Sequence, residues 1–157
     1  MAWEASTRPV EAQGVRQVII RTGLVMTRSG GWMQPLLLPY RFFAGGPLGS
    51  GKQWWPWIHI QDYVQSVIHL LHQAGAQGVY NVVGPHSTRM EDFGKMLATV
   101  ISRPYWLPTP AFGLKLLLGE MSTLVLDGQR AVPVRLVESG YSYAYPELRP
   151  ALENLFK

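Results

Sequence analysis

The sequence predicts an α/β fold, and two observations support this class. Two β-branched runs, residues 18–24 and 79–83, have the length and composition of strands that are buried on both faces. Segments with apolar residues at helical spacing precede, separate and follow these runs, so helices and strands alternate along the chain. Because two strands alone do not make a stable open sheet, we expect them to belong to a larger one.

The first predicted elements surround the first of these strands. Residues 3–13 are typical of the end of a helix that Gly14 stops, and residues 15–25 predict the strand itself. Residues 27–31, with the sequence TRSGG, predict a turn. Residues 32–43 are apolar and predict a helix, with Pro35 near its first turn, where proline is tolerated.

The second part of the chain begins with a helix predicted at residues 61–73. Val64, Val67, Ile68 and Leu71 recur there with a helical period, and Asp62 lies in the first turn, where a carboxylate suits the helix dipole. The remaining predicted elements are a strand at 79–83, a helix at 90–101, a proline-rich linker at 104–110, an apolar helix at 111–118 that 121–126 continue, a helix at 133–139, a strand at 141–143 and an amphipathic helix at 147–156.

Composition narrows the class of protein. The 157 residues suffice for one domain, and 47% apolar with 15% charged residues indicates a folded chain. The net charge of +4 comes from scattered basic residues, which disfavours nucleic acid as a partner but allows an acidic small molecule. The absence of cysteine excludes disulfides, thiolate catalysis and zinc–thiolate sites. With no apolar run long enough for a membrane, we expect a soluble cytoplasmic protein, a mitochondrial one being the alternative.

The central stretch, residues 45–62, combines a glycine-rich loop with three of the six tryptophans. Residues 46–52 match the first seven positions of a phosphate-binding P-loop, G-x-x-x-x-G-K. The eighth position should carry a hydroxyl group for magnesium, and here it is Gln53. A P-loop also opens a helix, whereas an aromatic, strand-like run follows this loop. The pattern therefore disfavours a nucleotide hydrolase.

Six short motifs occur in a fixed order along the chain. They are RTGLV at 21–25, GGPLGSG at 45–51, WIHIQD at 57–62, GEM at 119–121, GQR-x-x-P at 128–133 and GYSYAYPEL at 140–148. Together they resemble the C-terminal half of extended short-chain dehydrogenases/reductases, and more narrowly the atypical epimerase-family branch of the 39U member 1 type. The resemblance covers essentially all of the chain.

This resemblance implies the C-terminal part of an NAD(P)-binding, Rossmann-like fold that lacks its N-terminal glycine-rich βαβ half. Residues 1–25 and 61–83 would be remnants of the Rossmann sheet and its helices, and residues 26–60 and 84–157 mainly a substrate-side lobe. The implied function is that of an NADP-dependent oxidoreductase or sugar-nucleotide epimerase, acting on a small molecule such as a nucleotide-sugar.

The resemblance also implies a cofactor site at the end of the first strand. Gly23, Leu24 and Val25 would lie against the nicotinamide end of NADP, with the Val25 backbone within reach of the carboxamide. Ligands of open α/β sheets gather at the carboxyl ends of strands, which agrees with this placement. The alternative is that Gly23 only lets the chain turn out of the sheet.

Substrate contacts are implied around the central stretch. Gly46 and Gly49 belong to a loop that covers a nucleotide-sugar in extended relatives, with Arg41 beside it. The alternative is a flexible surface connection. Trp57 would line the substrate cleft or belong to the core. Relatives with known sugar substrates usually carry Arg or Lys before the histidine motif, where this chain has Trp55 and Pro56, so recognition of uridine diphosphate is in question.

Histidines offer few further sites. His59 would contact substrate, or with Asp62 it would form a metal pair or an oriented base, since imidazole titrates near neutrality. The favoured interpretation is that His59 bonds to backbone at a buried strand end and that Asp62 caps the helix. His69 and His72 lack a carboxylate partner, so we predict that they lie on the surface. No metal site is predicted.

The family's catalytic parts do not occur in the sequence. There is no G-x-G-x-x-G turn for the dinucleotide pyrophosphate. The catalytic Tyr-x-x-x-Lys pair is also missing, because the residues four before the lysines are Leu48, Glu91, Ala111 and Glu153. We therefore expect a truncated chain with no catalytic residue and no tight NADP binding. The alternative is a non-catalytic binding or regulatory module, or an unstable fragment that self-associates through exposed sheet edges.

Overall fold

The computed structural model describes residues 4, 9, 13–110, 112 and 127–157. The helices predicted at 3–13, 111–118 and 121–126 lie almost entirely outside the described residues. The helices predicted at 32–43, 61–73, 90–101, 133–139 and 147–156 are confirmed. The described elements are, in chain order, β1(Val18–Thr22), β2(Leu24–Met26), α3(Met33–Arg41), β3(Trp54–Trp55), β4(Trp57–His59), α4(Ile60–His72), β5(Gly78–Val82), β6(Thr88–Arg89), α5(Met90–Val100), α8(Val134–Glu138) and α9(Leu148–Phe156).

The described strands form three pairs. β1 pairs with β5 and β2 with β4, both in parallel, whereas β3 pairs with β6 in antiparallel fashion. Parallel pairs need a long crossover: α3 lies between β2 and β4 along the chain, and α3 and α4 both lie between β1 and β5. The mixed α/β class is therefore confirmed.

The strand predicted at 15–25 is in fact two strands that change partner at Gly23. The Gly23 N–H donates to the carbonyl oxygen of Val82, at the end of β5, and the next N–H, of Leu24, donates to Pro56 beside β4. A Cβ on Gly23 would lie 2.2 Å from the Pro56 carbonyl oxygen, so only glycine fits. The prediction of one continuous strand is wrong, because a contact with a distant residue sets the break.

The prediction that the first strand is buried on both faces is also wrong. In β1, Val18, Ile19 and Ile20 are half-buried, while Arg21 and Thr22 are exposed. Parallel strands are normally covered on both faces. Within the described residues, β1 has β5 as its single strand partner, which leaves much of it accessible to solvent.

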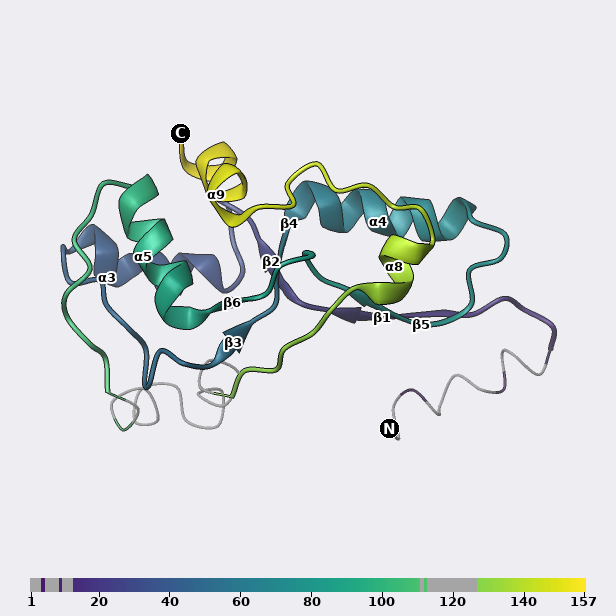
Figure 1. The fold of residues 1–157 in the computed structure, drawn as a ribbon, viewed down its shortest axis with the longest axis horizontal. Coiled ribbons are helices and arrows are strands. Elements are labelled where there is room, and N and C mark those ends of the chain that lie inside the picture. Colours follow the sequence, from purple (N-terminus) through teal and green to yellow (C-terminus); the bar gives the residue numbers. More distant parts are fainter. Residues whose placement is uncertain (1–3, 5–8, 10–12, 111, 113–126) are drawn as a thin grey trace.

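The molecule has two hydrophobic cores, one in each of the two halves that Figure 1 shows. The helical half, on the left of the figure, packs α3, α5 and α9 around a cluster that includes Met33, Phe93 and Leu152. The sheet half, on the right, places α4 and α8 beside β1 and β5 around a smaller cluster that includes Tyr80 and Leu136. β2 and β4 connect the two halves.

The apolar period of α4 does not face the core. Val64, Ile68 and Leu71 are exposed, by 44%, 39% and 63% of their surface, whereas Leu70 is buried. The period correctly predicted the helix, but the buried side of α4 carries two polar residues, Asp62 and Ser66, together with Leu70. Within the described residues, no helix has both the length and the apolar character that a membrane crossing requires.

The strand predicted at residues 141–143 is absent, and the segment is irregular. The hydroxyl groups of Tyr141 and Tyr143 donate to the carbonyl oxygens of Asp62 and Val83. These side-chain bonds fix the segment across α4 and the end of β5 without a strand partner.

Candidate functional site

The glycine-rich loop at residues 45–51 packs tightly against residues 104–109. The Gly49 N–H donates to the Thr109 carbonyl oxygen at 2.9 Å, and the Thr109 N–H donates to Pro47 at 2.8 Å. A Cβ on Gly46 would lie 2.0 Å from the Leu107 carbonyl oxygen. The loop is therefore packed against residues 104–109, since its glycines let two backbone segments come into contact.

The same loop cannot act as a P-loop. The N–H groups of Gly49, Gly51 and Lys52 all donate to acceptors inside the chain, so they are not available to cradle a phosphate. Gln53 is buried and donates its side-chain amide to the Leu48 carbonyl oxygen at 2.9 Å. The loop then enters β3 and no helix. The structure agrees with the exclusion made from the sequence.

Trp54 of β3 carries two guanidinium groups close to its ring. The Cζ atom of Arg89 lies 3.8 Å from the ring centroid and that of Arg130 lies 5.0 Å from it. Both distances are within the range of a cation–π contact. Arg89 stands opposite Trp54 in the β3–β6 pair, and Gly128 packs so closely that a Cβ on it would lie 2.2 Å from the Trp54 carbonyl oxygen.

These residues form a basic group next to the glycine-rich loop. Arg89 donates to the carbonyl oxygen of Lys52, which brings the end of the loop to Trp54. Among the described residues, neither Arg89 nor Arg130 forms an ion pair. We call Trp54, Arg89 and Arg130 the Trp54 cluster. Its planar cations suit a phosphate or a carboxylate, and its indole ring suits a flat or apolar group.

Sequence reasoning missed both arginines of the Trp54 cluster. Arg130 lies in the GQR-x-x-P motif, and this motif was a signal that could have found it. Arg89 reaches Trp54 only through strand pairing, which the local sequence does not indicate.

The other tryptophans of the central stretch belong to the core. Trp55 and Trp57 are 3% and 1% exposed, and both are members of the helical half's cluster. Trp57 was the predicted substrate contact, but its ring is buried, whereas the half-buried Trp54 reaches the surface.

Gly23, Leu24 and Val25 lie where the chain passes from β1 to β2. The carbonyl oxygen of Val25 accepts a hydrogen bond from the Trp32 indole at 2.8 Å. One backbone group of Val25 is therefore already used within the chain. Gly23 is required for close packing against Pro56, at the point where the chain changes strand partner.

His59 caps α4 from a buried position. It is 2% exposed, its Nδ1 atom accepts from the Gln61 N–H at 3.1 Å, and its ring centroid lies 4.1 Å from that of Tyr145. Burial lowers the pKa of His59 below its usual 6.5, against the opposing effect of the Asp62 charge. A neutral imidazole is consistent with accepting the helix N–H, so the prediction that His59 bonds to backbone is confirmed.

Asp62 does not cap the helix. Its carboxylate is 1% exposed and accepts from the Ala144 N–H at 2.7 Å, the Tyr145 N–H at 2.9 Å and the Tyr141 hydroxyl at 3.1 Å. Burial and the neighbouring carboxylate raise the pKa of Tyr141, so this phenol stays protonated and donates. Asp62 therefore anchors residues 141–145 to α4.

Two further side chains lie apart from these groups. His69, read as a surface residue, is half-buried, and its Nε2 atom lies 3.0 Å from the Ser139 hydroxyl group at the end of α8. Arg41 lines a cleft that includes none of Gly46, Gly49, Trp57 or His59. No three His, Asp or Glu side chains gather for a metal ion anywhere in the described part of the chain.

Known proteins resemble this chain over nearly all of its length. A family described as "Domain of unknown function (DUF1731)" matches residues 109–155. The epimerase family protein YfhF of Bacillus subtilis is 42% identical over 153 residues, which are 98% of this chain. The crystal structure of human epimerase family protein SDR39U1 (isoform 2) with NADPH superposes with a TM-score of 0.86 at 37% identity, covering 90% of this chain. The chain matches the C-terminal half of an epimerase family protein. This confirms the resemblance drawn from the motifs.

The epimerase family also accounts for the fold. A nucleoside-diphosphate sugar epimerase from Corynebacterium glutamicum superposes with a TM-score of 0.75 at 28% identity, over 98% of this chain and 29% of that one. The chain covers 50% of YfhF and 48% of the SDR39U1 chain, so it spans about half the length of these relatives. Its α/β architecture is that of the C-terminal part of an extended short-chain dehydrogenase/reductase.

Proposed function

We propose that these residues supply the substrate side of an NADP-dependent oxidoreductase or sugar-nucleotide epimerase. The observation that carries this proposal is the Trp54 cluster, in which Arg89 and Arg130 lie 3.8 and 5.0 Å from one indole ring beside the glycine-rich loop. Guanidinium groups bind diphosphates in a bidentate manner, and an indole face packs against a base or sugar ring. The substrate would lie between the cluster and the loop that carries Gly46 and Gly49.

The other residues predicted to bind substrate do not contact it in this proposal. Trp57 and His59 are the buried first and last residues of β4, so we propose that they shape the floor of the substrate site without touching the ligand. Arg41 lies in a different cleft and is not needed for this role. In this scheme residues 26–60 and 84–157 form the substrate-side lobe, and residues 1–25 and 61–83 continue a Rossmann sheet.

For the cofactor, we propose that Gly23, Leu24 and Val25 contact the nicotinamide end. The sequence has no G-x-G-x-x-G turn for the pyrophosphate, so the fit to the cofactor is limited to its nicotinamide end. At that end the Val25 carbonyl oxygen already accepts a hydrogen bond from Trp32. When bound, the cofactor would exchange a hydride with the substrate carbon. The chain's own part is to hold the substrate against the nicotinamide.

We further propose that the 157-residue chain does not catalyse the reaction by itself, because the sequence has neither the pyrophosphate turn nor the Tyr-x-x-x-Lys pair. An acid/base pair accounts for about two to four orders of magnitude in rate. The alternative function is a non-catalytic binding module, which the intact Trp54 cluster favours.

Calorimetric titration tests these proposals. UDP-glucose should bind the chain, and Arg130→Gln should weaken this binding about tenfold, the effect of one lost charged hydrogen bond. Lys95→Gln, which removes an equal charge from an ion pair on α5, should leave it unchanged. NADPH should bind no tighter than about 1 mM. A micromolar NADPH affinity would contradict the claim of incompetence, and equal losses in both variants would contradict the substrate site.

A further inference from the structure

A cleft of about 640 Å³ lies between four segments of the helical half. It is lined by the loop after β2, by α3, by the residues that follow α5, and by the end of α9. Its lining includes no residue of the Trp54 cluster and none of Gly23, Leu24 and Val25. It is therefore separate from the site of the proposed function.

Three arginines line this cleft, which we call the arginine cleft. Arg28 comes from the loop after β2, Arg41 from the last turn of α3 and Arg103 from the loop after α5, and all three are exposed. The lining holds no carboxylate, and among the described residues none of the three arginines forms an ion pair. Three like charges around one hollow create a positive potential that an anion would neutralise.

Neutral groups contact the side chains of Arg41 and Arg103 and the backbone of Arg28, without cancelling the charge of these arginines. Gln34 accepts a hydrogen bond from the Arg41 guanidinium at 3.4 Å and donates its amide to the Arg28 carbonyl oxygen. The Cζ atom of Arg103 lies 4.7 Å from the centroid of the Phe43 ring. Each guanidinium has five N–H donors, and these contacts leave most of them for a ligand.

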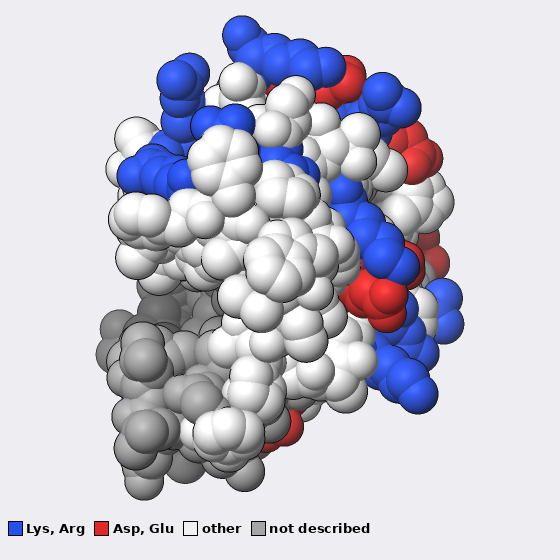
Figure 2. All heavy atoms as spheres, turned by 90° about the vertical axis from the view of Figure 1, so that its left-hand side faces the viewer, with Lys and Arg blue, Asp and Glu red and all other residues white. Residues whose placement is uncertain are grey.

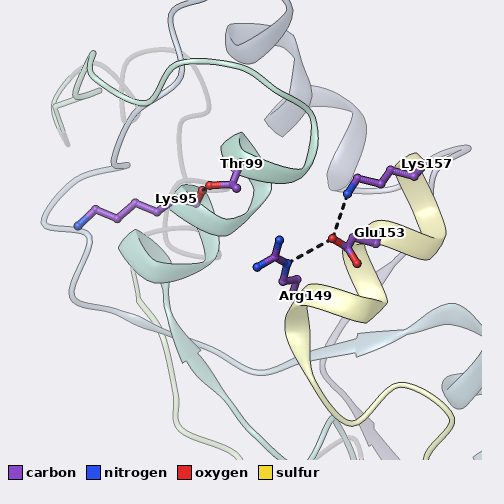
Figure 3. Close-up of polar contacts among 5 residues, drawn as sticks. All are labelled: Lys95, Thr99, Arg149, Glu153 and Lys157. Carbon is purple, nitrogen blue, oxygen red and sulfur yellow. Dashed lines mark hydrogen bonds and ion pairs between the residues drawn. The ribbon is translucent and has the colours of Figure 1, made fainter.

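The neighbouring carboxylate on α9 is already engaged. Glu153 accepts from Arg149 at 3.2 Å and from Lys157 at 3.0 Å, and Figure 3 shows its side chain between the two. These bonds, first that of Lys157, lower the pKa of Glu153. Figure 2 shows this end of the molecule, where Lys and Arg side chains gather toward the top of the face.

The rest of the arginine cleft is apolar. Leu37 of α3, Ile101 after α5 and Phe156 of α9 complete its lining. Its volume is within the range of pockets that hold small organic molecules. A free inorganic ion would use the arginines but not this apolar wall.

We propose that the arginine cleft binds an organic diphosphate, such as a nucleoside diphosphate, with the phosphates on the three arginines and the organic part on the apolar wall. Guanidinium forks match phosphate oxygens in geometry as well as in charge. Three guanidinium groups provide more positive charge and more N–H donors than a single carboxylate can use. Two linked phosphates have enough charge and acceptor oxygens to engage all three.

The test is titration of ADP into the 157-residue chain, with the triple variant Arg28→Gln, Arg41→Gln, Arg103→Gln. The triple variant should lose ADP affinity by at least about tenfold, as expected for lost charged hydrogen bonds. Pyrophosphate should compete with ADP but bind more weakly, because it leaves the apolar wall bare.

Two control variants locate the binding. Lys95→Gln, Arg149→Gln, Lys157→Gln removes the same charge from the same end of the molecule, from residues drawn in Figure 3, and should change the affinity by less than about twofold. Arg89→Gln, Arg130→Gln disables the Trp54 cluster and removes any ADP bound there, and the ADP bound by the arginine cleft should remain.

Three results would overturn the proposal: no ADP binding at about 1 mM, an equal loss in the Lys95 triple variant, or a loss confined to the Arg89 and Arg130 variant. The last result would assign ADP to the Trp54 cluster. A failure of ADP to bind the arginine cleft would not contradict the proposed function, which concerns the Trp54 cluster. If the first triple variant unfolds, the single substitutions at exposed Arg28, Arg41 and Arg103 serve instead, and each should weaken ADP binding severalfold.

Discussion

The helical half and the sheet half of the molecule differ in how much core they have. Among the described residues, sixteen buried side chains form the cluster of the helical half, against six in the sheet half. Apolar burial is the main favourable term in folding, so the helical half should hold most of the stability of the chain. The sheet half depends more on single polar contacts, such as those of Asp62, which join it to the C-terminal segment.

The largest expected effect comes from breaking the larger core. Phe93 is fully buried, with its ring centroid 5.2 Å from that of Trp55, and Phe93→Ala should lower the free energy of unfolding by about 3–5 kcal/mol. The matched change in the sheet half, Leu136→Ala, should cost about 2–3 kcal/mol, because fewer buried groups surround it. Urea denaturation followed by circular dichroism measures both. A larger loss from Leu136→Ala would reverse the comparison.

The next effect concerns the contact between the sheet half and residues 141–145. Asp62→Asn should lower the free energy of unfolding by about 2–3 kcal/mol, because an amide has one acceptor oxygen for three donors. The exposed Asp92→Asn should cost less than about 0.5 kcal/mol in the same urea experiment. Equal losses would mean that the Asp62 bonds do not hold the segment.

A pH titration should reveal His59 at the boundary of the two halves. Its pKa is below 6.5 in the folded chain, so the unfolded chain takes up the proton first as the pH falls. The stability from the neutral imidazole is therefore present above pH 6.5 and decreases below it, toward the folded-state pKa. His59→Asn should flatten the urea midpoint between about pH 7.5 and about pH 5.5. His72→Asn, at an exposed position, should keep the slope of the parent chain.

The smallest effect is expected on the outer side of α4. Leu71 is 63% exposed, so Leu71→Gln should change the free energy of unfolding by less than about 0.5 kcal/mol. Its neighbour Leu70 is 1% exposed, and Leu70→Ala should cost about 2–4 kcal/mol. A substantial loss from Leu71→Gln, together with a smaller sedimentation coefficient, would show that chains associate through this side.

Local patterns in the sequence predicted most of the helices, but not which side of them is buried. The period of Val64, Ile68 and Leu71 correctly indicated α4, yet the buried side carries Asp62 and Ser66. The burial of Asp62 depends on partners about eighty residues later in the chain, which no local pattern contains.

Partners distant in the sequence also explain the other differences. The break in the first strand at Gly23 depends on contact with Pro56. In place of the strand predicted at 141–143, the Tyr141 hydroxyl group and the N–H groups that follow this segment donate to Asp62. For the site, the motifs located the glycine-rich loop. They did not distinguish Trp54 from Trp57, because strand pairing with Arg89 determines which ring reaches the surface.

The Asp62 contacts also determine when the fold can be completed during translation. The ribosome releases α4 long before residues 144 and 145, so the Asp62 carboxylate has no backbone partner until the last part of the chain emerges. α9, which supplies Leu152 and Leu155 to the helical half, emerges later still. Both halves therefore remain incomplete until synthesis of these residues ends, and the nascent chain exposes apolar surface throughout that time.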